Sequence, residues 1–137
     1  MLTLNQNDKR RILRMPWRVF VHPDVPFIET VYAGVLTGTE LSAAIRETIS
    51  FAGMHRRNRF LADCQALEGG HSFSDLFFLA DLVLSCDPEH LLKEAVLAND
   101  TPTVSRHALF WETTCLNRGL KVRLFTDRQS AIDWLAG

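Results

Sequence analysis

Apolar and polar residues follow two periods along this chain, one typical of β-strands and one typical of α-helices. Five short apolar or alternating runs predict strands, at residues 17–21, 27–33, 59–63, 93–98 and 120–125. Four stretches with apolar residues at spacings of three and four predict helices, from Thr37 to Gly53, from Ser72 to about Ser85, from Thr101 to Gly119 and from Asp127 to Leu135. The predicted order is β-β-α-β-α-β-α-β-α.

The connections between these elements indicate the fold class. The turn His22-Pro23-Asp24 is short, which predicts an antiparallel hairpin of the first two strands. The later strands alternate with helices, and repeated strand–helix–strand units require right-handed crossovers and a largely parallel sheet. We therefore predict a single α/β domain over residues 16–137, a mixed β-sheet covered by helices.

Composition narrows the function classes. The chain has 137 residues and a formal net charge of −1, without the basic excess of a dedicated nucleic-acid binder. Its three cysteines, Cys64, Cys86 and Cys115, fit neither a disulfide framework nor a paired-cysteine zinc site, which suits a reducing compartment. No motif predicts a cofactor, and the five histidines lack the spacing of a metal site. We expect a cytoplasmic protein with no nucleic-acid partner.

Residues 1–15 differ from the rest of the chain. They are locally basic and show no sustained apolar period, so we expect a flexible basic arm that is dispensable for folding. They also lack the apolar core of a signal peptide. No stretch of the sequence is long and apolar enough to predict a membrane span.

Short motifs in a fixed order carry a resemblance to a known family. They are Val31-Tyr32-Ala33-Gly34, Thr37 with Glu40-Leu41, Phe60-Leu61-Ala62-Asp63, Ala95-Val96-Leu97, residues 118–125 and Ala131-Ile132-Asp133-Trp134-Leu135. Their order and spacing, between Pro16 and Leu135, resemble the SpoIIAA-like family, relatives of the STAS domains of anti-sigma-factor antagonists. The resemblance implies a STAS/SpoIIAA-like fold and a non-enzymatic, cytosolic regulatory or protein-interaction module.

The resemblance also directs attention to the start of the second predicted helix. In the antagonists, an Asp-Ser pair in this region supplies the serine that a partner kinase phosphorylates. Here Asp63 is followed by Cys64, so the phosphoserine motif is not matched residue for residue. Ser72 and Ser74 are positional candidates for the same regulation.

Asp63, Cys64 and His71 form a second candidate group. They lie between a strand end and a helix start, where α/β proteins tend to place ligand sites. A thiol-dependent hydrolase at Cys64 is one alternative, with His71 lowering the pKa of the thiol. No nucleophile motif supports that chemistry, so we assign no catalytic residue and predict that the protein is not an enzyme.

The helix predicted from Ser72 is apolar on more than one side. Its core-facing stripe is predicted to be Phe73, Leu76, Phe77, Ala80, Val83 and Leu84. Phe78, Leu79 and Leu82 are predicted to face outward, where apolar side chains need a cover. Other helices of the chain can supply that cover. The sequence favours a homodimer through this surface, and the alternative is a small apolar, lipid-like ligand in a cavity beside Phe78 and Leu82.

Overall fold

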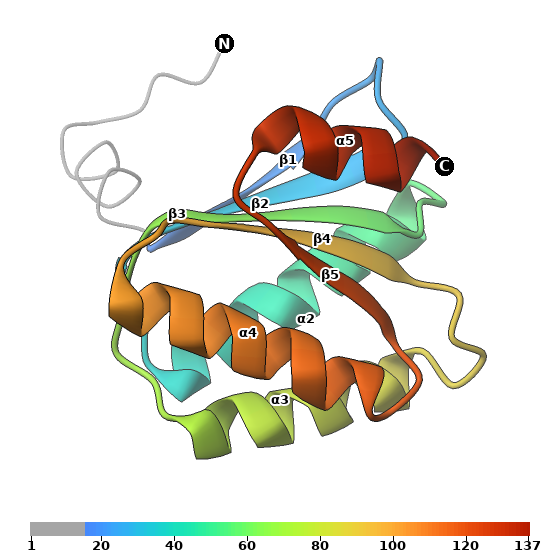
Figure 1. Cartoon of the computed structure of the whole chain (residues 1–137). Coiled ribbons are helices and arrows are strands. Elements are labelled where there is room, and N and C mark those ends of the chain that lie inside the picture. The colour runs from blue at the N-terminus through green and yellow to red at the C-terminus, as the bar shows by residue number, and fades with distance from the viewer. Residues whose placement is uncertain (1–15) are drawn as a thin grey trace, which may run out of the picture.

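The computed structural model describes residues 16–137 as one five-stranded sheet with helices on both faces (Figure 1). The strands are β1 (Trp17–Val21), β2 (Phe27–Val35), β3 (Arg59–Gly69), β4 (Lys93–Ala98) and β5 (Lys121–Phe125). The helices are α2 (Gly38–Met54), α3 (Phe73–Cys86), α4 (Pro102–Leu116) and α5 (Arg128–Ala136). The basic segment 1–15, for which the sequence predicts a flexible arm, lies outside the described residues.

The sheet has the strand order β1-β2-β3-β4-β5. Strand β1 pairs antiparallel with β2, with Trp17 opposite Tyr32, and the other neighbouring strands pair in parallel. This mixed sheet confirms the predicted fold class and element order. The short turn after β1 forms the hairpin, and each later strand is reached through a helix, as parallel pairing requires.

The two faces of the sheet have different covers. Helix α5 covers one face, and α2, α3 and α4 lie on the other (Figure 1). Because successive side chains of a strand point to opposite faces, β3 divides its residues between them. Leu61 packs with Ala131 and Leu135 of α5, whereas Ala62 belongs to the core on the three-helix side.

Helix α3 packs mainly against α2 and α4, beyond the layer that touches the sheet (Figure 1). This position corrects the predicted stripes. Leu79, predicted to face outward, is buried at 6% exposure, while Phe73 and Phe77, predicted to face the core, are each 46% exposed. The positions of α2 and α4 decide which side of α3 is buried. The spacing of apolar residues within α3 does not predict where those two helices lie.

Strand β3 continues six residues past its predicted end at Asp63, because β2 keeps pairing with it as far as Gly69. The chain then turns at Gly70, where φ is +101° and a Cβ atom would lie 2.7 Å from the Leu36 carbonyl oxygen. Only glycine fits so close to another backbone, so the approach to α3 is fixed at this point. Among residues 16–137, no helix is long and apolar enough to cross a membrane.

Candidate functional site

Asp63, Cys64 and His71 do not form one site. Asp63 points to the α5 face of the sheet, and Cys64 and His71 line a cavity on the three-helix face. Burial raises the pKa of the Cys64 thiol, and the charges of Glu94 and Asp63 add to this effect. The His71 ring donates from Nδ1 to the carbonyl oxygen of Leu36 at 3.1 Å. The group proposed from the sequence is therefore divided, and its thiol is held protonated.

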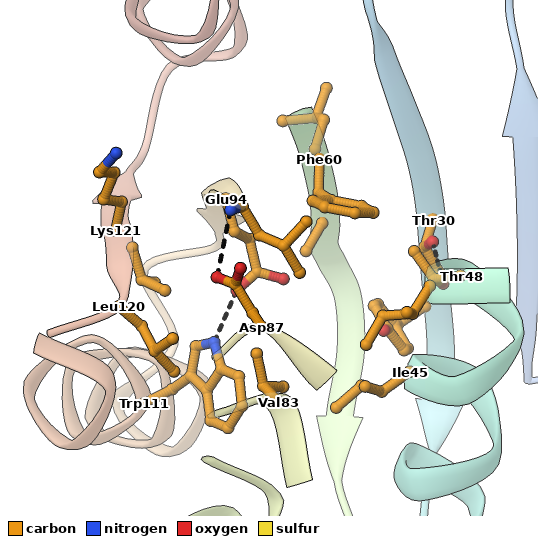
Figure 2. A pocket seen from close by; sticks show the side chains of 16 residues that line it. Thr30, Ile45, Thr48, Phe60, Val83, Asp87, Glu94, Trp111, Leu120 and Lys121 are labelled. Carbon is orange, nitrogen blue, oxygen red and sulfur yellow. Dashed lines mark hydrogen bonds between the residues drawn. The ribbon is translucent and has the colours of Figure 1, made fainter. Parts of the chain in front are cut away.

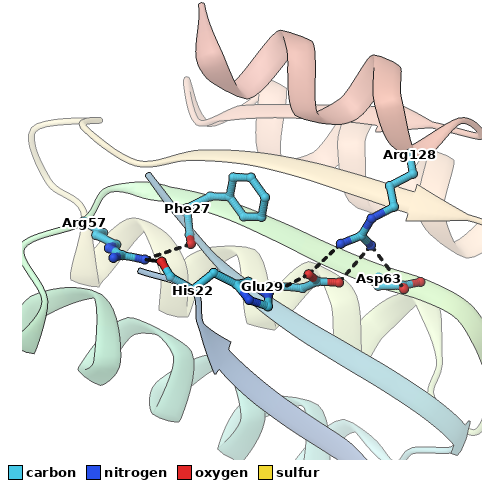
Figure 3. Close-up of polar contacts among 6 residues, drawn as sticks. All are labelled: His22, Phe27, Glu29, Arg57, Asp63 and Arg128. Atoms are coloured by element: carbon cyan, nitrogen blue, oxygen red, sulfur yellow. Dashed lines mark hydrogen bonds and ion pairs between the residues drawn. The ribbon is translucent and has the colours of Figure 1, made fainter. Parts of the chain in front are cut away.

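On the α5 face, Asp63 belongs to a polar cluster (Figure 3). Arg128 of α5 donates to both carboxylate oxygens of Glu29, at 2.9 and 2.7 Å, and lies 3.8 Å from Asp63. His22 approaches Glu29 at 3.3 Å. Burial works to raise the pKa of Glu29, but the hydrogen bonds and charge of Arg128, with those of His22, hold it below its usual value. The cluster ties α5 to β2 and β3.

Metal binding finds no support in the described part of the chain, where no three His, Cys, Asp or Glu side chains come together.

The start of α3 holds Ser72 and Ser74 in different ways. The Ser72 hydroxyl accepts from the Asp75 backbone N–H at 3.0 Å, and the Asp75 carboxylate accepts from the Ser72 N–H at 2.8 Å. The Ser72 N–H bond also lowers the pKa of Asp75. This reciprocal capping box fixes the Ser72 side chain. Ser74 is exposed in the first turn, with its hydroxyl free of hydrogen bonds to the described residues.

The outer surface of α3 is aromatic. Phe77 and Phe78 meet edge to face with ring centroids 5.7 Å apart, and Phe78 is 68% exposed. The guanidinium of Arg118, held by an ion pair to Asp81, lies 4.4 Å from the Phe77 ring centroid. Phe73 stacks at a tilt on Phe110 of α4. Phe78 is thus the most exposed of these rings.

Phe78 stands beside an open groove between α2 and α3, with a volume of about 580 Å³. The α2 side is formed by small or polar residues, Gly38, Thr39, Ser42, Ala43 and Arg46. The α3 side is formed by Asp75, Phe78, Leu79 and Leu82. A hollow beside Phe78 and Leu82 was required for the ligand alternative, and this one is too open to enclose a small molecule.

Two smaller cavities lie between the sheet and the three helices. Figure 2 shows the first of them. Their volumes are about 50 and 70 Å³. They share a set of wall residues, Tyr32, Ile45, Ala62, Glu94 and Trp111. Cys64, His71 and His107 line the second cavity, so two of the predicted site residues do face a common space.

Glu94 is the chemically distinctive group between these cavities, and the sequence analysis missed it. Its Oε1 accepts from the indole N–H of Trp111 at 2.7 Å (Figure 2). Burial raises the pKa of Glu94 to about 7, although the Trp111 hydrogen bond works in the opposite direction. The signal was present in the sequence, because Glu94 shares the inward-facing period of Val96 and Ala98 in β4.

The fold has clear relatives among solved structures. An anti-sigma factor antagonist from Mycobacterium paratuberculosis superposes with a TM-score of 0.57 at 12% identity, over 90% of this chain and 97% of that one. The anti-sigma factor antagonist SpoIIAA in its unphosphorylated form gives 0.55 at 14% identity, over 88% and 98%. A DUF3478-family protein with a SpoIIAA-like fold from Shewanella loihica PV-4 gives 0.53 at 19% identity, over 87% and 91%.

These similarities confirm that the chain has the SpoIIAA-like fold that its motif order predicts. The sequence itself matches no protein-family model and no curated protein. At identities below one in five, the likeness is one of architecture, and function has to be argued from the surfaces and cavities of this chain.

Proposed function

We propose that this chain is a non-enzymatic, cytoplasmic regulatory module that acts by binding protein surfaces, and that it forms a homodimer through the groove between α2 and α3. The observation that carries the proposal is Phe78, a phenylalanine 68% exposed on the rim of that groove. A large ring left in water beside a hollow is typical of a docking surface. The fold shared with two anti-sigma factor antagonists supports a regulatory role.

A second copy of the chain suits this groove by shape. Gly38, Ser42 and Ala43 on the α2 side are small, so they leave room for an aromatic ring. About a two-fold axis, Phe78 of each copy lies over the α2 helix of the other, which makes one patch complementary to itself. Burying the ring in this way removes its apolar surface from water.

The charges of the groove suit the same arrangement. Arg46 and Asp75 both line it, and no ion pair joins them within the described chain. In a two-fold dimer, Arg46 of one copy faces the region of Asp75 in the other, and the opposite charges favour that orientation. The proposed dimer therefore buries the Phe78 ring, which is exposed in one copy, and brings Arg46 of one copy near Asp75 of the other.

Ser74 provides a route for regulating this contact. It is exposed in the first turn of α3, next to Asp75 in the groove. A phosphate there adds a charge of about −2 beside an existing carboxylate, and this repulsion weakens docking of a second surface. Ser72 is the less accessible acceptor because its hydroxyl caps the helix. Intact-mass analysis of protein from its native cells tests this point, and a protein that is never phosphorylated contradicts it.

The homodimer is tested by light scattering coupled to size exclusion at micromolar concentration. The wild type is expected to be dimeric, and Phe78→Asp monomeric with an unchanged circular dichroism spectrum, because an unpaired charge at the centre of the contact is desolvated. Leu82→Asp, on the same wall of the groove, is a second variant. Met54→Asp is the matched control, since Met54 is 71% exposed and lies outside the groove. A monomeric wild type, or a dimeric Phe78→Asp, overturns the proposal.

A further inference from the structure

The two internal cavities have mostly apolar walls with few polar groups. Both are bounded by the aromatic rings of Tyr32 and Trp111 and by the aliphatic side chain of Ile45. Leu76 and Leu79 close the second cavity from the α3 side. An apolar space with a small number of placed polar groups is the usual form of a small-molecule site. This space is separate from the groove beside Phe78, so it is independent of the proposed dimer.

Two polar groups in the second cavity have unused hydrogen-bonding capacity. Glu94 receives one hydrogen bond from the described residues, at Oε1 from Trp111. The buried Nδ1 of His107 has no hydrogen-bond partner among residues 16–137. Burial lowers the pKa of His107, so its ring is neutral near neutral pH, and in the tautomer that carries the proton on Nε2 the Nδ1 atom can accept a hydrogen bond from a ligand. Buried polar atoms are normally paired, so an unpaired one beside a cavity points to a missing partner.

The chemistry of these groups selects a hydroxyl. The protonated carboxyl of Glu94 can donate a hydrogen bond, and the neutral imidazole of His107 can accept one. A ligand hydroxyl can do both, so it matches the two groups. An anionic ligand group is less suitable because, among the residues that the structure describes, no Lys or Arg lines the second cavity, and a cationic group is less suitable because Glu94 is the one carboxylate there to replace its water. The ligand should therefore be neutral, with one hydroxyl on an apolar body.

The volumes limit the size of that body. The cavities measure about 50 and 70 Å³ and adjoin one another. An apolar cavity of about 150 Å³ holds benzene, so neither cavity alone admits an aromatic ring, and a single-ring ligand needs the two spaces joined and widened by a shift of α3. A lipid chain is far too large for them without a major rearrangement.

Access to the cavities runs past α3. This helix packs on α2 and α4 rather than directly on a strand, so its displacement opens the space without breaking a strand pair. Because α3 packs on α2 and α4, its inner side is apolar even though it does not lie directly on the sheet. We propose that the adjoining cavities are a binding site for a small neutral aromatic alcohol of about the size of phenol, with its hydroxyl bound by Glu94 and His107 beneath α3.

The test is a heteronuclear NMR titration of the full chain with phenol, toluene and benzylamine near neutral pH. The indole N–H of Trp111 is the reporter, because it donates to Glu94, and the indole of Trp17, bonded to Glu47, is the internal control. Phenol is expected to shift the Trp111 signal saturably and to bind about tenfold more tightly than toluene, as one buried hydrogen bond implies. Trp17 should not respond.

Three variants separate hydrogen bonding from shape. Glu94→Gln keeps a donor and an acceptor and should retain the preference for phenol, whereas Glu94→Leu should bind phenol no better than toluene. Ala108→Leu extends into the second cavity from α4 and should weaken both ligands, which keeps the test decisive where Glu94→Leu fails to fold. The inference is overturned by an absence of saturable phenol binding, by tighter binding of benzylamine, or by an undiminished phenol preference in Glu94→Leu.

Discussion

Arg128 in α5 donates hydrogen bonds to both carboxylate oxygens of Glu29 in β2, at 2.9 and 2.7 Å, although the two residues are 99 positions apart in the chain. Glu29 is buried, and among the described residues its charge has one other ion-pair partner, His22 at 3.3 Å, while Asp63 shares the Arg128 guanidinium. The contact fastens the last helix to the sheet at a point that no local pattern specifies.

Removing the guanidinium should therefore leave a buried carboxylate without its main partner. Arg128→Ala is expected to lower the free energy of unfolding by about 2 kcal/mol, less than for a fully buried pair because Arg128 is half-exposed. The double variant Glu29→Gln/Arg128→Ala should lose less than Arg128→Ala alone. Urea denaturation of the wild type and the variants measures both effects.

The pH dependence of this pair has a definite sign. Because the pKa of folded Glu29 lies below its usual value, the pair stabilises the protein above that usual value and the stabilisation is lost as pH falls. The difference between wild type and Arg128→Ala should shrink on acidification. A difference that stays constant from neutral to acidic pH would show that Arg128 acts only through packing.

Much of the fold was predictable because it is encoded locally. Strands β1 and β4 begin and end where the alternation of the sequence predicts. The capping boxes of Thr37 with Glu40 and of Ser72 with Asp75 involve residues only three positions apart, and both are present. Strand alternation also explains why neighbours Asp63 and Cys64 face opposite sides of the sheet. That separation was implicit in the sequence, although the predicted site placed them together.

The orientation of α3 was not predictable in the same way. Leu79 and Phe77 are both apolar and both fit a helical stripe, yet one is buried and the other is exposed. Which side faces inward depends on α2 and α4, which approach from distant parts of the sequence. Of the residues predicted to face outward, Phe78 is exposed and Leu79 is buried, while Phe73 and Phe77, predicted to face the core, are exposed.

Glu94 should make the stability of the protein fall as pH rises. Its pKa is about 7 in the folded chain against a usual 4.5, so the folded state holds the proton more tightly across that interval. Stability is then highest below the usual value and declines through neutral pH, by up to about 3 kcal/mol. Urea denaturation at about pH 5 and about pH 8 measures the decline.

Glu94→Gln is the matched control for this effect. The other ionisable groups around the two cavities, Tyr32, Cys64, His71, Asp87, His107 and Lys121, stay the same in both proteins. The difference in unfolding free energy between the two proteins therefore isolates residue 94. An equal decline with pH in Glu94→Gln would assign the effect to one of those other groups.

The cysteines should differ sharply in reactivity. Burial raises the pKa of the Cys64 and Cys115 thiols, whereas Cys86 is exposed at the end of α3. Since the thiolate is the reactive form, iodoacetamide should label Cys86 first, and the other two only after unfolding in urea. Peptide mass spectrometry at a series of times measures the order. Labelling of Cys64 as fast as Cys86 would restore the thiol-hydrolase alternative.

Ser72 and Ser74, two positions apart at the start of α3, should respond very differently to alanine. Ser72→Ala removes the oxygen that accepts from the Asp75 N–H, and it should lower the free energy of unfolding by about 1 kcal/mol. Ser74→Ala removes an exposed hydroxyl without a partner among the described residues, so the expected change is within about 0.5 kcal/mol. Thermal and urea unfolding of the two variants measure the contrast. Equal losses would mean that Ser74 also has a structural contact at this helix start, and that a phosphate on Ser74 acts by destabilising α3 instead of by repelling a docked surface.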